Sequence, residues 1–273
     1  MIKLVATDLD GTLLRHDKTV SAWTRSVLDA ARESGIHVIP VTARQPLGLV
    51  QIAEQAGLVD WAIGCNGGLG YHLETGEVLF EHLLPPDAMA DLAAAVASEL
   101  PETRFASVRD RGDTFIAQDG YAAMTAPGDH GRDPQQMGRA KLIEVVADPA
   151  LKLVLRHPWV HPRDLLRIVL QVGTGGLEAT WSGADFVEVV APGVTKATGL
   201  DELCRHLGVQ QSEVAAFGDG LNDIEMLRWA GHSWAMDGSS DAVRDAAKGI
   251  AVSNMDDGVA RQVMAFLRDP SAW

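Results

Sequence analysis

The feature that most constrains the fold is a regular alternation of short apolar runs with helix-like segments. Near the N-terminus, strand-like runs at residues 3–7, 37–41 and 61–65 are separated by segments whose apolar residues recur at helical spacing. Ser21 is a suitable N-cap for the first of these helices, and Gly35 closes it. Short strands that alternate with helices predict an α/β fold, in which helices cover both faces of a Rossmann-like parallel sheet.

The same alternation returns in the last third of the chain. Strand-like runs at residues 186–190 and 214–217 alternate with a helix that ends at Gly208 and with a second helix that begins near Ile224. In parallel sheets of this kind, ligands bind beyond the carboxyl ends of the strands. The acidic and glycine-rich clusters of the sequence lie directly after these strands, so we expect the chemistry there.

The region between these two parts follows a looser pattern. It begins with two consecutive prolines, and it contains two helix-like stretches and a turn-rich stretch at residues 126–131. We interpret residues 83–190 as an inserted α+β cap domain, which would set substrate specificity. Residues 1–82 and 191–273 would together form the catalytic core.

Charge and composition exclude several classes of function. The net charge of -14 argues against nucleic acids and anionic membranes as partners. No apolar run approaches the ~18 residues of a membrane helix, and the N-terminus does not resemble a signal peptide. Cys65 and Cys204 are too few for a disulfide framework, which favours a reducing, cytoplasmic setting. An anionic substrate would need a local reversal of charge, from a cation, a lysine or backbone N–H groups.

The strongest motif is Asp-x-Asp-Gly-Thr at residues 8–12, directly after the first strand. Alternate residues of an extended chain face the same side, so Asp8 and Asp10 would project together. Two carboxylates at one strand end can bind a hard cation and also perform nucleophilic and acid–base chemistry. A solvated turn is the alternative, but a chance match to this motif is expected only about once in 10⁵ positions.

Three further segments follow strands in the same way. Asp219, after the run at residues 214–217, would complete a cation site with the first two aspartates, and Asn222 or Asp223 could instead cap the next helix. The hydroxyl of Thr42 suits a phosphate oxygen, although a helix N-cap explains it equally well. Lys196 lies between a strand and a helix, a position that distinguishes it from an ordinary surface lysine.

These four segments resemble, in the same order along the chain, the motifs of the haloacid dehalogenase superfamily of aspartate-nucleophile phosphohydrolases. The long insertion, together with Asn-Gly-Gly at residues 66–68 and Asn-x-Asp-Asp-Gly-Val at residues 254–259, resembles the Cof-type subfamily of subclass IIB. The resemblance implies a Mg²⁺-dependent phosphatase that hydrolyses small phosphate monoesters, such as sugar phosphates, through an aspartyl-phosphate.

The resemblance also implies a role for each motif residue. Asp8 would be the nucleophile, and Asp10 the general acid and base that also offers its backbone carbonyl to Mg²⁺. The other metal ligands would be Asp8 and Asp219. Asp223 would bind water on the metal or steady Lys196. The phosphate would be bound by Thr42, Lys196 and Asn222.

Two departures from the family pattern stand out. Ala43 replaces the usual glycine after Thr42, which would strain the backbone if that position required a positive φ. Asp237-Gly238 replaces a frequent Gly-Asn near the expected metal site. Two alternative functions remain open at this point. A phosphomutase would transfer the phosphoryl group back to substrate instead of to water. A binding protein would keep the same fold without catalytic activity.

Overall fold

The computed structural model describes residues 1–271 and 273 completely, and the backbone of residue 272. The chain forms two compact units. The first contains residues 1–43, 49–80 and 195–273, and the second contains residues 44–48 and 81–194. The roles of catalytic core and specificity cap, expected from the sequence, stay a prediction.

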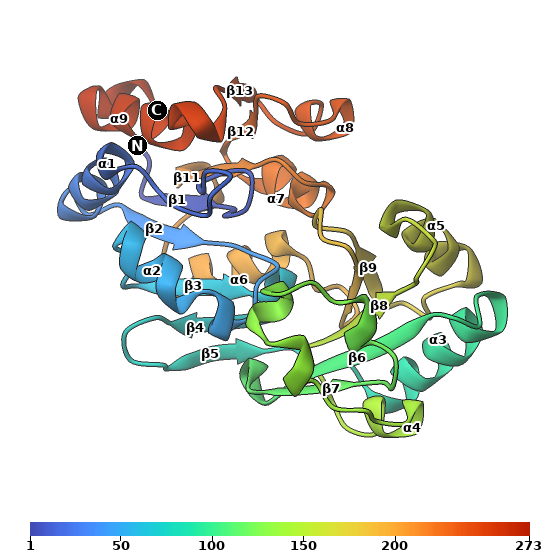
Figure 1. The fold of residues 1–273 in the computed structure, drawn as a ribbon. Helices are drawn as coiled ribbons and strands as arrows, with labels where there is room; N and C mark the ends of the chain where they lie inside the picture. Colours follow the sequence, from blue (N-terminus) through green and yellow to red (C-terminus); the bar gives the residue numbers. More distant parts are fainter. The chain divides into compact units, whose positions relative to one another are not determined.

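The first unit is built on a parallel sheet of five strands, in the order β13-β12-β11-β1-β2 (Figure 1). The strands are β1 (Leu4–Thr7), β2 (His37–Pro40), β11 (Val214–Gly218), β12 (His232–Met236) and β13 (Gly249–Ala251). Every strand pair in this sheet is parallel. The predicted parallel sheet is therefore confirmed. Because β1 pairs with both β2 and β11, the carboxyl ends of these three strands lie side by side.

The helices of the first unit include four that the sequence predicts and, after them, two that it does not. They are α1 (Ala22–Glu33), α2 (Val50–Ala56), α6 (Lys196–Leu207), α7 (Ile224–Trp229), α8 (Asp241–Arg244) and α9 (Gly258–Arg268). The Ser21 hydroxyl accepts a hydrogen bond from the backbone N–H of Thr24, which caps α1. Gly208 adopts a left-handed φ of 68° and ends α6.

The third expected strand does not join the parallel sheet fully. Residues of β3 (Trp61–Gly64) contact the parallel sheet through one bridge, between Val41 and Ile63. β3 instead pairs antiparallel with β4 (Leu69–His72), which is followed in the same sheet by β5 (Val78–Glu81). An apolar run reveals a buried strand, but it does not show which neighbour the strand chooses.

The second unit contains an antiparallel sheet in the order β7-β6-β8-β10-β9. The strands are β6 (Arg104–Arg109), β7 (Thr114–Ala117), β8 (Lys152–Arg156), β9 (Glu178–Thr180) and β10 (Val187–Val190), and the helices are α3 (Pro86–Glu99), α4 (Leu142–Val145) and α5 (Pro162–Val172). The run at residues 186–190 had suggested a strand of the parallel core. It lies here instead, because Val187 and Val189 pack into the core beneath α3 and α5.

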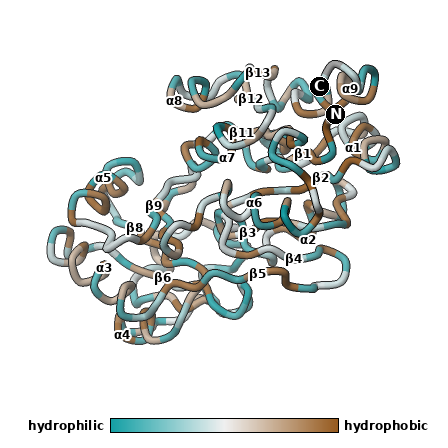
Figure 2. The backbone as a smooth tube through the Cα atoms, turned by 180° about the vertical axis from the view of Figure 1, so that it is seen from behind, coloured by the Kyte–Doolittle hydropathy of each residue, from teal (hydrophilic) through white to brown (hydrophobic). Residues whose placement is uncertain are grey.

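The two faces of this antiparallel sheet differ in chemistry. Alternate residues pack against α3 and α5 on one face, while Lys152 and Glu188 form a buried ion pair of 2.6 Å on the other. The apolar character of strands such as β1 and β8, and the hydrophilic loops between elements, are visible in Figure 2. Among the described helices, none combines the length and hydrophobicity that a membrane span requires.

His130 is held in an aromatic and cationic environment of the second unit. Its ring centroid lies 4.5 Å from that of Phe186, and its Nε2 is 2.9 Å from the hydroxyl oxygen of Tyr121. Burial and, to a smaller extent, the positive charges of Lys152, Arg156 and Arg132 together lower the pKa of His130 to about 2. The imidazole is therefore neutral in the folded protein.

The low pKa of His130 predicts a loss of stability in mild acid. Below its ordinary value of 6.5, the unfolded chain binds a proton that the folded protein does not, so the free energy of unfolding falls as the pH falls. The slope is at most about 1.4 kcal/mol per pH unit. Between pH 7.5 and 5.5, we expect the melting temperature of His130→Gln to fall less than that of the wild type. The exposed His16→Gln should behave as the wild type, and equal slopes for all three proteins would contradict the prediction.

Candidate active site

Two neighbouring strands carry the first acidic groups to one edge of the sheet. Asp8 follows β1 directly, and Asp219 follows β11 directly. These strands pair in parallel, with Thr7 opposite Phe217, so both aspartates leave the sheet at the same edge. The backbone N–H of Asp8 also donates to the carbonyl of Phe217 at 3.0 Å. The sheet itself therefore places Asp8 beside Asp219, as the motif spacing predicts.

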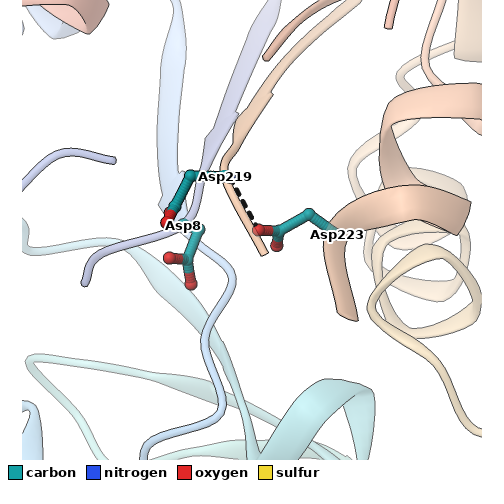
Figure 3. A group of neighbouring side chains, drawn as sticks. All are labelled: Asp8, Asp219 and Asp223. Carbon is teal, nitrogen blue, oxygen red and sulfur yellow. Dashed lines mark hydrogen bonds between the residues drawn. The ribbon is translucent and has the colours of Figure 1, made fainter. Parts of the chain in front are cut away.

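Asp223 brings a third carboxylate to these two. Carboxylate oxygens of Asp8, Asp219 and Asp223 all lie within 4.8 Å of one another (Figure 3). Asp223 also fixes the loop after β11, because its Oδ2 accepts hydrogen bonds from the backbone N–H groups of Asp219 and Gly220. Its side chain does not cap α7.

A buried lysine forms ion pairs with two of the three carboxylates. Lys196 begins α6, and its Nζ lies 2.6 Å from Oδ1 of Asp8 and 2.5 Å from Oδ1 of Asp223. The residue is only 1% exposed. Burial opposes its charge, but the carboxylates of Asp223 and Asp8 outweigh that effect and raise the pKa of Lys196. Lys196 is thus a permanent cation, and its ion pair with Asp223 agrees with the expectation that Asp223 steadies it.

One lysine does not balance three carboxylates. Burial raises the pKa of Asp8 well above its ordinary value; Lys196 opposes this rise, whereas Asp223 and Asp219 add to it. Burial likewise raises the pKa of Asp219 to about 6, with a further contribution from Asp223. The excess of clustered oxygen donors fits a hard divalent cation such as Mg²⁺, which would restore the charge balance.

The side chain of Asp10 lies apart from the three clustered carboxylates. Its Oδ1 accepts a hydrogen bond of 2.8 Å from Nζ of Lys18, on the turn that follows. The Asp10 side chain is about one-third exposed. This placement leaves the carboxyl group partly accessible to solvent. The expected roles of Asp10 in proton transfer and, through its backbone carbonyl, in metal binding stay predictions.

Two neighbours of Asp10 fix Asp219, and the sequence analysis missed one of them. Thr12 donates a hydrogen bond of 2.6 Å from its hydroxyl to Oδ1 of Asp219. Gly11 has a φ of +90°, and a Cβ at this position would lie 2.4 Å from Oδ2 of Asp219. Gly11 is therefore required for close approach of the carboxylate as well as for the turn. The adjacent Gly-Thr of the first motif carried this information, but only the fold shows the partner.

The remaining phosphate-site candidates are joined through Asn66, a second residue whose role the sequence did not reveal. The backbone N–H of Asn66 donates to the carbonyl of Thr42 at 3.0 Å. Its side-chain Oδ1 accepts a hydrogen bond of 2.9 Å from Nδ2 of Asn222. The neighbouring Gly67 packs so closely on Thr195 that an added Cβ would lie 2.0 Å from the Thr195 carbonyl oxygen. The Asn-Gly-Gly loop thus ties Thr42 and Asn222 to the start of α6.

The two departures from the family pattern do not disturb this arrangement. Ala43 does not adopt a positive φ, so it carries none of the strain that a required glycine would imply. Asp237 lies 3.5 Å from Arg244 with a mostly exposed side chain, and Gly238 adopts a φ of +98°. Ala43 is therefore accommodated without backbone strain, and Asp237 makes a surface contact with Arg244.

The contact of Gly11 with Asp219 generates a prediction with a matched control. Gly11 and Gly35 both have positive φ, but only at Gly11 would a Cβ meet another atom within 4 Å. Gly35→Ala should cost about 1 kcal/mol in free energy of unfolding, from backbone strain alone. Gly11→Ala should cost at least twice as much, and adding Mg²⁺ should not raise the melting temperature of this variant. Equal effects of the two substitutions in thermal unfolding would contradict the proposed packing.

This chain is similar to known phosphatases and hydrolases. A family model described as haloacid dehalogenase-like hydrolase matches residues 5–263. Pyridoxal phosphate phosphatase YbhA of Escherichia coli (strain K12) is 28% identical over 275 residues, covering 97% of this chain and 98% of the relative. The 5-amino-6-(5-phospho-D-ribitylamino)uracil phosphatase YcsE of Bacillus subtilis (strain 168) is also 28% identical, covering 96% and 94%.

Solved structures show the same fold. The haloacid dehalogenase subclass IIB sugar phosphatase BT4131 superposes with a TM-score of 0.82 at 23% identity, covering 97% of this chain and 98% of that one. The family match spans almost the whole chain, and the residues that carry the resemblance meet at one edge of the sheet. This chain therefore belongs to the haloacid dehalogenase-like hydrolases.

Proposed function

We propose that this protein hydrolyses small phosphate monoesters in a Mg²⁺-dependent reaction that passes through a phosphorylated Asp8. The observation that carries the proposal is the position of the Asp8 carboxylate. It is buried at a strand end, bound by Lys196 at 2.6 Å, and surrounded by two further carboxylates that suit a divalent cation. A nucleophilic anion and an anionic substrate can meet only where positive charge of this kind is present.

The reaction has two balanced steps. In the first, an oxygen of the Asp8 carboxylate forms a bond to phosphorus while the ester P–O bond breaks, and Asp10 gives a proton to the departing alcohol oxygen. In the second, water attacks phosphorus and the bond to Asp8 breaks. Asp10 takes the proton from that water. The products are the alcohol and inorganic phosphate, and both aspartates return to their starting states.

The other residues would hold the transferring group. Lys196, Thr42 and Asn222 would bind the phosphoryl oxygens, and the hydrogen bond from Asn222 to Asn66 supports a fixed amide there. The residues that would hold Mg²⁺ are Asp8, Asp219 and the backbone carbonyl of Asp10, with support from Asp223. When bound, the metal supplies positive charge to the oxygens of the phosphoryl group.

The substrate class follows from chemistry shared among relatives. The relatives named above are phosphatases of pyridoxal phosphate and of a phosphorylated ribityl compound. Both substrates are monoesters of small, polar alcohols. We therefore propose the same class for this chain, with specificity residues in the inserted region 83–190. The two cysteines of the chain, Cys65 and Cys204, are both buried, and two thiols are too few for a disulfide framework. We therefore further propose action in a reducing, cytoplasmic setting.

Asp8→Asn tests the nucleophile. An amide keeps the shape of the side chain but does not form the phosphorylated intermediate, so phosphate release should fall to background while the protein stays folded. The measurement is inorganic phosphate released from a panel of monoesters, alongside the melting temperature. Asp29→Asn removes a carboxylate that pairs with arginines on α1, and it should retain turnover. Substantial release by purified Asp8→Asn would sink the assignment. Transfer of phosphate between sugar positions without release would instead favour a phosphomutase.

The metal proposal predicts that Mg²⁺ supports turnover and that Ca²⁺ inhibits it. Mg²⁺ requires compact octahedral geometry, whereas Ca²⁺ accepts more and longer oxygen contacts. A larger ion would engage both oxygens of Asp8 and leave none directed at phosphorus. Turnover should vanish in a chelator, return with Mg²⁺, and decline as Ca²⁺ is added at constant Mg²⁺. Full activity in chelator, or equal rates with the two ions, would refute the proposed site.

A further inference from the structure

The C-terminal motif at residues 254–259 has no part in the proposed chemistry, yet its side chains reach the loop that carries Asp10. The motif spans the end of the connection from β13 to α9 and the first two residues of α9. Two of its residues, Asn254 and Asp257, bind the segment just after the catalytic aspartates, about 240 residues earlier in the chain. A contact of such long range, made by polar groups, needs an explanation beyond the folding of a surface loop.

Asn254 holds the backbone of the catalytic loop. It is 8% exposed, and its Nδ2 donates a hydrogen bond of 2.6 Å to the carbonyl oxygen of Leu14. The backbone N–H of Leu14 in turn donates to the carbonyl of Leu9 at 2.8 Å. Leu9 is the residue between Asp8 and Asp10. A chain of two hydrogen bonds therefore joins Asn254 to the peptide between the two catalytic carboxylates.

Asp257 holds the turn that follows. Its carboxylate accepts hydrogen bonds from Nη2 of Arg15 at 3.1 and 3.2 Å, and from the hydroxyl of Thr24 at 3.0 Å. Asp257 directly precedes α9, where an aspartate would ordinarily cap the helix, but its side chain makes no such bond. Its φ of +58° is also unusual for a residue other than glycine. Asp257 thus forgoes the usual helix cap and adopts an uncommon backbone conformation, and its carboxylate binds Arg15 instead.

The turn after the first motif links Arg15 to the carboxyl group of Asp10 through Lys18. The backbone N–H of Lys18 donates to the carbonyl of Arg15 at 2.9 Å. The Nζ of Lys18 then donates to Oδ1 of Asp10 at 2.8 Å. Fixing Arg15 therefore fixes the residue whose ammonium group orients the Asp10 side chain.

The segment that makes these contacts is itself rigid. The backbone N–H of Gly258 donates to the carbonyl of Ser253 at 3.2 Å, which closes the loop. A Cβ at Gly258 would lie 1.9 Å from the carbonyl oxygen of Val252, so only glycine permits this closure. α9, which follows, packs against α1. Rigid support of this kind is what a precisely oriented acid–base group requires.

Building on the function proposed above, we infer that Asn254 and Asp257 are positioning residues for Asp10. They act through Leu14 and through Arg15 with Lys18, respectively, and touch neither substrate nor metal. Their loss should impair proton transfer to the leaving alcohol more than the attack of Asp8 or the binding of Mg²⁺.

The test compares two esters of similar size that differ in their need for a general acid. Benzyl phosphate releases a poor leaving group that must be protonated, whereas 4-nitrophenyl phosphate releases a good one. The ratio of their kcat/KM values reports assistance by Asp10 in the first step. The change in this ratio for Asp10→Asn is the largest that loss of general acid–base catalysis can produce, about 10²–10⁴-fold. Asp29→Asn, a carboxylate paired with arginines on α1, is the control for loss of an ion pair.

We expect Asn254→Ala to lower kcat/KM for benzyl phosphate by roughly 10-fold or more, and that for 4-nitrophenyl phosphate by less than about 3-fold. Asp257→Asn should shift the ratio in the same direction by a smaller factor, because asparagine tolerates the left-handed backbone and still accepts from Thr24. The rise in melting temperature on adding Mg²⁺ should match the wild type in both variants. Asp29→Asn should leave the ratio unchanged.

The outcomes separate the two proposals. Equal losses for both esters, or no loss for either, would overturn the positioning role while leaving the phosphatase proposal intact. A loss of the Mg²⁺ response in both variants would also overturn it, since the contacts would then serve the metal site. If wild-type protein released phosphate from no ester, the proposed function itself would fail, and the positioning role with it. Should Asn254→Ala not fold, the ratio measured for Asp257→Asn decides alone.

Discussion

The buried ion pairs of Lys196 are the interaction on which the rest of the site depends. Lys196 lies between Asp8 and Asp223 with almost no exposure to solvent. A charge so buried is tolerated only when its partners are fixed, and removal of one partner of such a pair typically costs about 3–5 kcal/mol. The two partners are fixed differently: Asp8 by β1, and Asp223 by the backbone N–H groups it accepts from. Lys196 thus joins three separate segments into one site.

The site also resolves the conflict between an acidic protein and an anionic substrate. The net charge of -14 repels phosphate esters on average. Within the site, three carboxylates exceed one lysine, and burial, with a smaller contribution from Asp223, raises the pKa of Asp219. A divalent cation would reverse the local sign at the point where the phosphoryl group is transferred. The same acidic cluster that disfavours the substrate therefore prepares the site for the metal that attracts it.

The sequence predicted the parallel core and the meeting of its motifs, because strands, helices and the motifs that follow strands can be recognised from local patterns. Asp8, Lys196, Asp219 and Asp223 could be named without coordinates. Thr12 and Asn66 could not be assigned partners, because their hydrogen bonds join segments that only the fold brings together. The strand at residues 187–190 continued the alternation of the core although it lay within the predicted insertion, and its apolar pattern fits parallel and antiparallel neighbours equally well.

The central place of β1 has a consequence for how the protein is made. Asp8 is synthesised 188 positions before Lys196, the lysine that pairs with it. On a ribosome, the first strand emerges long before β11, the neighbour that pairs with it. A nascent chain that ends before residue 196 contains Asp8 without its partner Lys196, and one side of β1 is unpaired. Folding of the first unit must therefore wait until most of the chain has emerged, and the intervening region has time to fold before the unit that surrounds it in sequence.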